Sequence, residues 1–300
     1  MIQICDAIVS EFQEKQIRMT LRQLYYQIVA RDLFPDDRFW RWIEARRKWI
    51  RDPRGTKNAE PNYRWLGGLV SDARLAGLLD WDAIEDRARQ PRSAAEFDSL
   101  RDLVDAAVAS FRLPRWRGQN TYVELWMEKD SLASVVEPIA RKWPVVLMLN
   151  RGYSSQSAMY EAAQRFQQVS GVLDRVIFYV GDHDPSGEDM VRDLRDRMAM
   201  FCVSVDVQKL ALTMAQVREY DPPPNPTKMT DSRAAWYVEK YGEKCWEAEA
   251  LPPDALIQIV DQAIADSVDQ RKMKAIIAEE ERGKRALLTA TKRIWKIERT

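Results

Sequence analysis

The sequence predicts an α/β protein in which a mostly helical N-terminal domain precedes a domain with a parallel sheet flanked by helices. Apolar runs at residues 122–127, 145–149 and 175–180 each end in polar, loop-forming residues, and a helix-like pattern follows each run. Strands that alternate with helices are typical of a parallel sheet. Residues 1–118, in contrast, are mostly helical in pattern.

Composition excludes several classes of protein. With 300 residues, of which 46% are hydrophobic, the chain is long enough for two domains with real cores. No apolar run approaches the roughly 18 residues that a membrane helix needs, and the N-terminus has no signal-peptide pattern. We therefore expect a cytoplasmic protein without a membrane partner.

The residues that usually hold zinc or form disulfides are scarce. The 3 cysteines are isolated and odd in number, which argues against a disulfide framework and a Cys-rich zinc site. His183 is the only histidine, so a multi-His zinc site is excluded, and we expect it to support neighbouring acids. The formal net charge is zero, so local charge runs carry more information than the total.

A helix is predicted to begin at Thr20, because Thr20 and Gln23 form a capping box. Tyr26 lies off the apolar stripe of this helix, and Arg22, four residues earlier, shares its face. A guanidinium there would hold a phosphate beside the phenol. The local sequence alone, however, favours an ordinary half-buried tyrosine beside a solvated arginine. The apolar stripe consists of Leu21, Leu24, Tyr25 and Ile28.

The next helices predicted are residues 37–50, where tryptophans and basic residues interleave, and residues 61–76. Basic and aromatic residues together are typical of nucleic-acid surfaces. Three helices before a hairpin-like end near residues 80–82 indicate a winged helix-turn-helix, although a plain helical bundle with solubilising arginines explains the pattern about equally well. The residues expected to contact double-stranded DNA are Arg46, Arg47, Lys48, Arg51 and Arg64.

The chain is predicted to divide into a domain at residues 1–112, a linker at 113–120 and a second domain at 121–300. The linker is indicated by Pro114 and Gly118, which flank a short polar stretch just before the first strand of the sheet.

Beyond the three βα units, we expect a further strand at residues 203–212. The proline-rich residues 221–226 are expected to lack regular structure. Helices should follow from residue 254 and end in a basic tail that carries Trp295 and contacts DNA or a second subunit.

Three carboxylates stand at strand ends: Glu128 after the first run, and Asp182 and Asp184 after the third. In open parallel sheets, ligands bind beyond the carboxyl ends of the strands. Hard oxygen ligands of this kind suit Mg²⁺ or Mn²⁺. Turn residues and helix caps would explain an isolated Asp-x-Asp pair, but the strand-end glutamate favours a metal site.

The motif Met127-Glu128-Lys129-Asp130, followed by Gly181-Asp182-His183-Asp184-Pro185-Ser186-Gly187, resembles the Toprim domain. That fold serves topoisomerases, primases and some nucleases. The resemblance implies that Glu128, Asp182 and Asp184 hold the metal.

The stretch Thr20-Leu21-Arg22-Gln23-Leu24-Tyr25-Tyr26 resembles the catalytic-tyrosine motif of the topoisomerase VI A subunit. The resemblance implies a winged-helix domain before the Toprim domain, Tyr26 as nucleophile, and Arg22 and Glu128 as catalytic partners. Residues 246–253 resemble a further stretch of that family, which suggests Glu247 and Glu249 as accessory acids.

The same resemblance bears on partners. Few residues precede Thr20, so we do not expect the N-terminal extension through which the family's A subunits join an ATPase B subunit. The chain is more similar to small, free-standing A-like proteins of bacteria and phages. In the family, the tyrosine of one protomer meets the acids of the other, so we expect a homodimer, because one chain with a short linker is not expected to bring its own pair together.

Three functions are consistent with these features. The first is a Mg²⁺-dependent DNA strand-breaking transesterase, in which Tyr26 forms a phosphotyrosine link. The second is a Toprim-type nuclease that uses water as nucleophile, in defence against foreign DNA. The third is a DNA-binding protein without catalysis.

Overall fold

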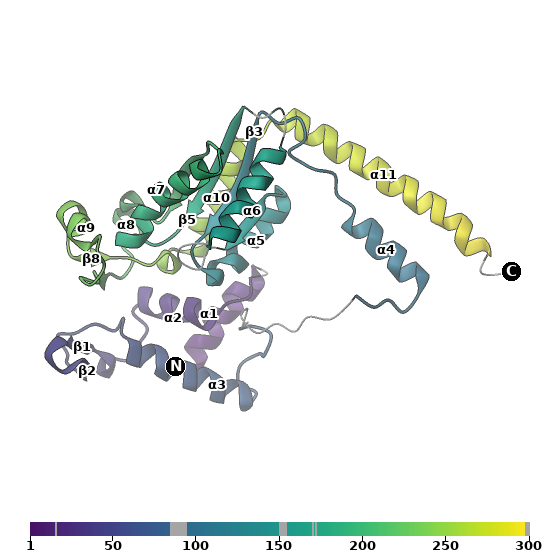
Figure 1. Cartoon of the computed structure of the whole chain (residues 1–300). Coiled ribbons are helices and arrows are strands. Elements are labelled where there is room, and N and C mark those ends of the chain that lie inside the picture. Colours follow the sequence, from purple (N-terminus) through teal and green to yellow (C-terminus); the bar gives the residue numbers. More distant parts are fainter. Residues whose placement is uncertain (16, 85–94, 150–154, 170, 172, 298–300) are drawn as a thin grey trace.

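The computed structural model describes residues 1–297 except 16, 85–94, 150–154, 170 and 172, with side chains up to residue 291 (Figure 1). The predicted tail residue Trp295 therefore lies outside the described side chains.

Helices α1 (Ile2–Glu14), α2 (Leu21–Ala30) and α3 (Glu60–Leu75) pack against one another. The predicted capping box of α2 is confirmed, because the Thr20 side chain accepts from the backbone of Gln23 and the Gln23 side chain accepts from the backbone of Thr20. The helix predicted at residues 61–76 is also confirmed, as α3. Fully buried apolar side chains from each helix, such as Phe12, Leu24 and Leu66, form the core between them.

The helix predicted at residues 37–50 is wrong. This region holds strands β1 (Trp40–Ile43) and β2 (Lys48–Arg51), which pair antiparallel, with short 3₁₀ turns η1 (Asp36–Arg38) and η2 (Glu44–Arg46). Aromatic side chains favour strands, and Trp42 faces Trp49 across the pair with ring centres 5.6 Å apart. The hairpin lies between α2 and α3, whereas the winged-helix interpretation placed a hairpin-like end after the third helix.

The parallel sheet is confirmed, with strand order β4 (Val146–Leu149), β3 (Thr121–Met127), β5 (Asp174–Val180) and β6 (Asp206–Ala211). All three neighbouring pairs are parallel. Helices α6 (Gln156–Gln168) and α7 (Pro185–Met200) contact each other, as do α5 (Ala133–Lys142) and α10 (Pro253–Asp266), and these two pairs flank the sheet (Figure 1). The central strands β3 and β5 are buried along most of their length.

The proline-rich segment is not wholly irregular. Its last residues form β7 (Asn225–Pro226), which pairs antiparallel with β8 (Lys244–Cys245). Proline is tolerated here because a two-stranded sheet consists only of edge strands. Helices α8 (Met214–Tyr220) and α9 (Ala234–Tyr241) lie before and between these strands.

Two helices, α4 (Leu100–Ser110) and α11 (Gln270–Ile297), form an arm that projects away from the sheet (Figure 1). The residues predicted as a linker are anchored to this arm: the buried Glu280 carboxylate accepts from the Leu113 N–H at 2.9 Å and from Arg115 Nη2 at 2.8 Å. A Cβ at Gly283 would lie 2.9 Å from the Phe111 ring, so glycine permits this close approach of the two helices.

The two predicted domains share a continuous core, which includes buried residues from Cys5 in α1 to Met273 in α11. Helix α2 contacts the short 3₁₀ turns η4 (Asp130–Leu132) and η5 (Ala248–Ala250). The tyrosine-bearing helix therefore lies directly against loops at the edge of the sheet. Within the described residues, no helix is long and apolar enough to cross a membrane.

Candidate functional site

Glu128 follows β3 and is held at the edge of the sheet by its neighbours. Its N–H donates to the Val180 carbonyl oxygen at 2.9 Å, and its Oε2 accepts from the Asp182 N–H at 3.1 Å and the Tyr179 hydroxyl at 3.2 Å. Burial, and then the charges of Asp182 and Asp184, raise the pKa of Glu128. The three predicted acids therefore lie within electrostatic reach of one another, as expected for residues at adjacent strand ends.

Asp182 and Asp184 have different local partners. Asp182 Oδ1 accepts from the Ala248 N–H at 2.9 Å, and its Oδ2 lies 2.6 Å from Lys129 Nζ. Asp184 is the N-cap of α7 and accepts from the Gly187 N–H at 2.7 Å. A Cβ at Gly187 would collide with the Asp182 carbonyl oxygen, which explains the glycine in this motif. Asp184 is thus a helix cap and also a neighbour of Glu128.

Lys129 supplies the positive charge in this cluster. Besides Asp182, its ammonium contacts Glu247 and lies 3.3 Å from Glu249 Oε2. Among the residues that the structure describes, no three His, Cys, Asp or Glu side chains are grouped so that they could hold a metal ion. The carboxylates are a suitable donor set for Mg²⁺ or Mn²⁺, but here they surround a lysine.

Arg22 and Tyr26 lie beside the same acids. Arg22 Nε donates to Glu249 Oε2 at 2.6 Å, and Arg22 Nη2 donates to Glu247 Oε2 at 3.0 Å. The guanidinium carbon lies 5.7 Å from the centre of the Tyr26 ring. The local sequence favoured a solvated arginine, but Arg22 is ion-paired with residues more than 200 positions away in the chain.

The Tyr26 side chain is buried, with 6% of its surface exposed. Burial raises the pKa of its phenol well above the ordinary value; Arg22 opposes this change, while Glu249 and Asp182 add to it. The phenol is therefore protonated at neutral pH and needs a base before it can act as a nucleophile.

Helix α2, which carries Tyr26, lies beside the loops of the acid cluster within one chain, which the sequence did not predict. The sequence led us to expect that a second protomer would be needed to bring them together. Instead, α2 packs on η4 and η5 of the same chain, and the charge of Asp182 reaches the Tyr26 phenol. The homodimer itself stays a prediction.

No family model, curated protein or solved structure matches this chain. The resemblance to the topoisomerase VI A subunit thus rests on the sequence motifs alone.

Two members of this cluster were missed as functional residues in the sequence. The sequence pattern assigns no role to Lys129, although it lies within the strand-end motif, or to Ser131 just after it, yet Ser131 Oγ donates to Glu249 Oε1. Glu249, suggested as an accessory acid, has a fully buried side chain that contacts Arg22, Lys129 and Ser131. The only available signal was the position of Lys129 and Ser131 directly after a strand end.

His183 joins the loop that carries Asp182 to the segment that carries Glu247 and Glu249. Its backbone pairs with Trp246, and its Nδ1 lies 2.7 Å from the Tyr237 hydroxyl. Burial lowers the pKa of the imidazole, so the ring is neutral. His183 therefore anchors Trp246, and hence Glu247 and Glu249, to the loop that carries Asp182.

The residues predicted to contact DNA lie in two elements. Arg46, Arg47 and Lys48 are exposed at the tip of the hairpin, where no hydrogen bond or ion pair joins them to other described side chains. Arg51 is at the hairpin base, 4.5 Å from the Trp40 ring centre and 3.3 Å from Asp37. Arg64 lies on α3 and pairs with Glu60. Three of the five form one compact basic tip.

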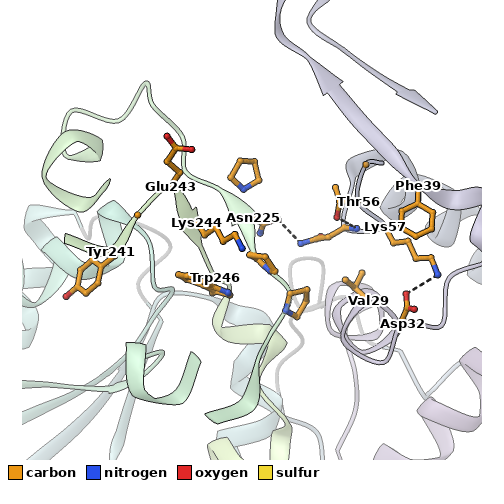
Figure 2. A pocket seen from close by; sticks show the side chains of 16 residues that line it. Val29, Asp32, Phe39, Thr56, Lys57, Asn225, Tyr241, Glu243, Lys244 and Trp246 are labelled. Carbon is orange, nitrogen blue, oxygen red and sulfur yellow. Dashed lines mark hydrogen bonds and ion pairs between the residues drawn. The ribbon is translucent and has the colours of Figure 1, made fainter. Parts of the chain in front are cut away.

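A cleft of about 730 Å³ lies between the hairpin base and the β7–β8 pair (Figure 2). Asn58 lines the cleft and donates to Asn225 Oδ1 at 2.7 Å, and Lys57, which also lines it, pairs with Asp32 at 2.9 Å. The opposite wall ends at Trp246, next to Glu247. The cleft thus separates the basic hairpin from the acid cluster.

Proposed function

We propose that this chain is a DNA strand-breaking transesterase in which Tyr26 attacks a phosphodiester. The observation that carries the proposal is the network of Arg22, Glu249, Lys129 and Asp182, because it brings the tyrosine-bearing helix to the strand-end acids. A nucleophile, a guanidinium suited to phosphate and a set of carboxylates then lie within one region.

In the proposed step, the Tyr26 oxygen forms a bond to phosphorus while the bond from phosphorus to one sugar oxygen breaks. The phenol proton passes to a carboxylate of the cluster, and the same proton is then donated to the departing sugar oxygen, so that the number of protons is unchanged. The bond energy is retained in the phosphotyrosine link, so the reverse reaction can rejoin the strand. Arg22 holds a non-bridging phosphate oxygen once it leaves Glu249.

Glu128, Asp182 and Asp184 would hold Mg²⁺ or Mn²⁺. As they lie in this structure, the described acids are not grouped to hold a cation. The raised pKa of Glu128, caused first by burial and then by the charges of Asp182 and Asp184, is consistent with an excess of negative charge that a cation would offset. When bound, the cation stabilises the charge of the transition state and the leaving oxygen. Lys129 has to withdraw from Asp182 for this site to form.

The proposal gives the basic hairpin tip the role of holding the duplex. Arg46, Arg47 and Lys48 are exposed beside Trp42, whose side chain is 41% exposed. Such a projection suits contact with phosphates in a groove, where each contact releases counterions.

A hydrolytic nuclease is the second candidate, and the burial of Tyr26 favours it. In the arrangement described, the phenol is closed off from a DNA backbone, whereas Glu128 and Asp184 are only half-buried and are open to water. In that reaction water attacks phosphorus, and no link to the protein forms.

Both candidates are tested by incubating the full chain with end-labelled duplex DNA and Mg²⁺, followed by denaturation and electrophoresis. The transesterase retains label on the protein, and Tyr26→Phe abolishes both the link and the cleavage. Free fragments that Tyr26→Phe still produces would select the nuclease. Asp182→Asn should abolish either reaction without unfolding the chain, and intact DNA throughout would leave only a DNA-binding protein.

A further inference from the structure

The arm formed by α4 and α11 exposes apolar side chains. Helix α4 carries a regular apolar stripe, yet none of its residues is buried. Leu100 and Leu103 are 46% and 43% exposed. A helix this short is marginal in water unless its apolar face packs against another surface. The stripe consists of Leu100, Leu103, Val104, Ala107, Val108 and Phe111.

Helix α11 covers this stripe only in part. The described contacts between the arm segments centre on Glu280, and on Gly283 opposite Phe111. Elsewhere α11 exposes its own apolar residues, with Ile277 40% and Leu287 38% exposed. The arm therefore carries more apolar surface than its two helices bury between them.

The charges of the arm are segregated. Residues 96–110 contain four acids and one base, whereas residues 282–297 contain six bases and no acid. Among the described side chains, no ion pair joins the acids of the first segment to the bases of the second. Glu280 instead forms ion pairs with Arg115 and Lys284. Each arm thus presents an acidic and a basic segment, and the described bases, at residues 282–285, form no ion pair with the acids of residues 96–110.

We infer that the arm is the docking surface for a second copy of this chain, with α4 of one protomer on α11 of the other. In a twofold pair each acidic segment meets a basic segment, and the contact occurs twice. The exposed apolar residues of α4 and α11 then form the centre of the contact. A DNA duplex would be repelled by the acidic segment, whereas a second copy complements both segments at once. The inference does not depend on the proposed chemistry.

The first test is sedimentation equilibrium of the full chain. We expect a dimer that Leu103→Glu weakens by at least about tenfold, because a charge replaces an apolar contact at its centre. Leu103 is half exposed, so the fold should persist, which circular dichroism checks. Leu75→Glu is the matched control: Leu75 is 73% exposed on α3, away from the arm, and its change should leave the dimer intact.

Charge reversal gives a second, independent test. Replacing Asp98 and Asp105 with Lys should weaken self-association, and so should replacing Arg282 and Arg285 with Glu. Mixing the two variants should restore a dimer, because each then offers the charge that the other lacks. A wild-type chain that stays monomeric, equal effects of Leu103→Glu and Leu75→Glu, or a mixture that does not pair would each overturn the inference.

Discussion

The acid cluster and the hairpin tip use charged residues in opposite ways. In the cluster, the Glu249 side chain is fully buried and bonded to Arg22, whereas Arg46 and Lys48 at the tip project into solvent. Buried charges require partners, because desolvation is costly unless an opposite charge offsets it. Exposed charges are free to bind an external anion. The cluster therefore joins parts of the chain to one another, and the tip is suited to a partner outside it.

The largest expected effect follows from breaking the cluster. Glu249→Ala leaves Arg22 and Lys129 without their shared buried partner, so we expect a loss of about 3 kcal/mol in the free energy of unfolding. Chemical denaturation measures this loss.

The control is Glu279→Ala, which removes an exposed pair with Arg117 and should cost at most about 1 kcal/mol. Equal losses for the two variants would mean that the cluster does not join the two halves of the chain.

Glu280 is a second buried carboxylate with several partners, and it lies at the joint where residues 113–115 contact α11. Burial raises its pKa, but the Leu113 N–H, Lys284 and Arg115 lower it further, so the net pKa lies below the ordinary value of 4.5. The stability that these contacts supply is present above the unfolded pKa and is lost as the pH falls through the lower folded pKa.

Glu280→Gln should therefore cost about 2 kcal/mol at neutral pH and flatten the acid side of the stability curve below pH 4.5. Denaturation at several pH values measures this. If the variant loses stability below pH 4.5 as steeply as the wild type, the Glu280 carboxylate does not stabilise this joint.

The hairpin tip should affect DNA binding without affecting stability. Replacing Arg46, Arg47 and Lys48 with Ala should reduce the slope of log affinity against log salt by about 2–3, since each phosphate contact on B-DNA contributes about 0.9. Fluorescence anisotropy at several salt concentrations measures the slope. Arg141→Ala, an exposed residue on α5, is the control. An unchanged slope would mean that the tip faces away from DNA.

The sheet could be predicted because its buried strands are nearly continuous apolar runs, such as residues 175–180. Such a run is recognised from neighbouring residues alone, without knowledge of distant contacts. The hairpin could not be predicted, because tryptophans interleaved with arginines in residues 40–51 suit either a helix or a strand. The cross-strand pairing of Trp42 with Trp49 favours the strand, and the local pattern does not reveal it. The acids were found from their strand-end positions. The pairing of Arg22 with Glu249 was not predicted, since it joins residues far apart in the chain and no local pattern encodes it.

The last and smallest effect concerns Lys129, which stands where the proposed cation would act. Its ammonium neutralises Asp182, so a cation has to compete with it for that carboxylate. Lys129→Met removes the competitor and leaves negative charge in excess. The variant should therefore be less stable without metal, yet gain more thermal stability from added Mg²⁺ than the wild type does. A tenfold gain in affinity corresponds to about 1.4 kcal/mol of additional stabilisation at saturating Mg²⁺. Thermal unfolding against Mg²⁺ concentration measures the difference, and Lys129→Met with Asp182→Asn is the control that should abolish it. If the double variant responds to Mg²⁺ as strongly as Lys129→Met alone, the cation does not bind at Asp182, and Lys129 is only a structural partner of the cluster.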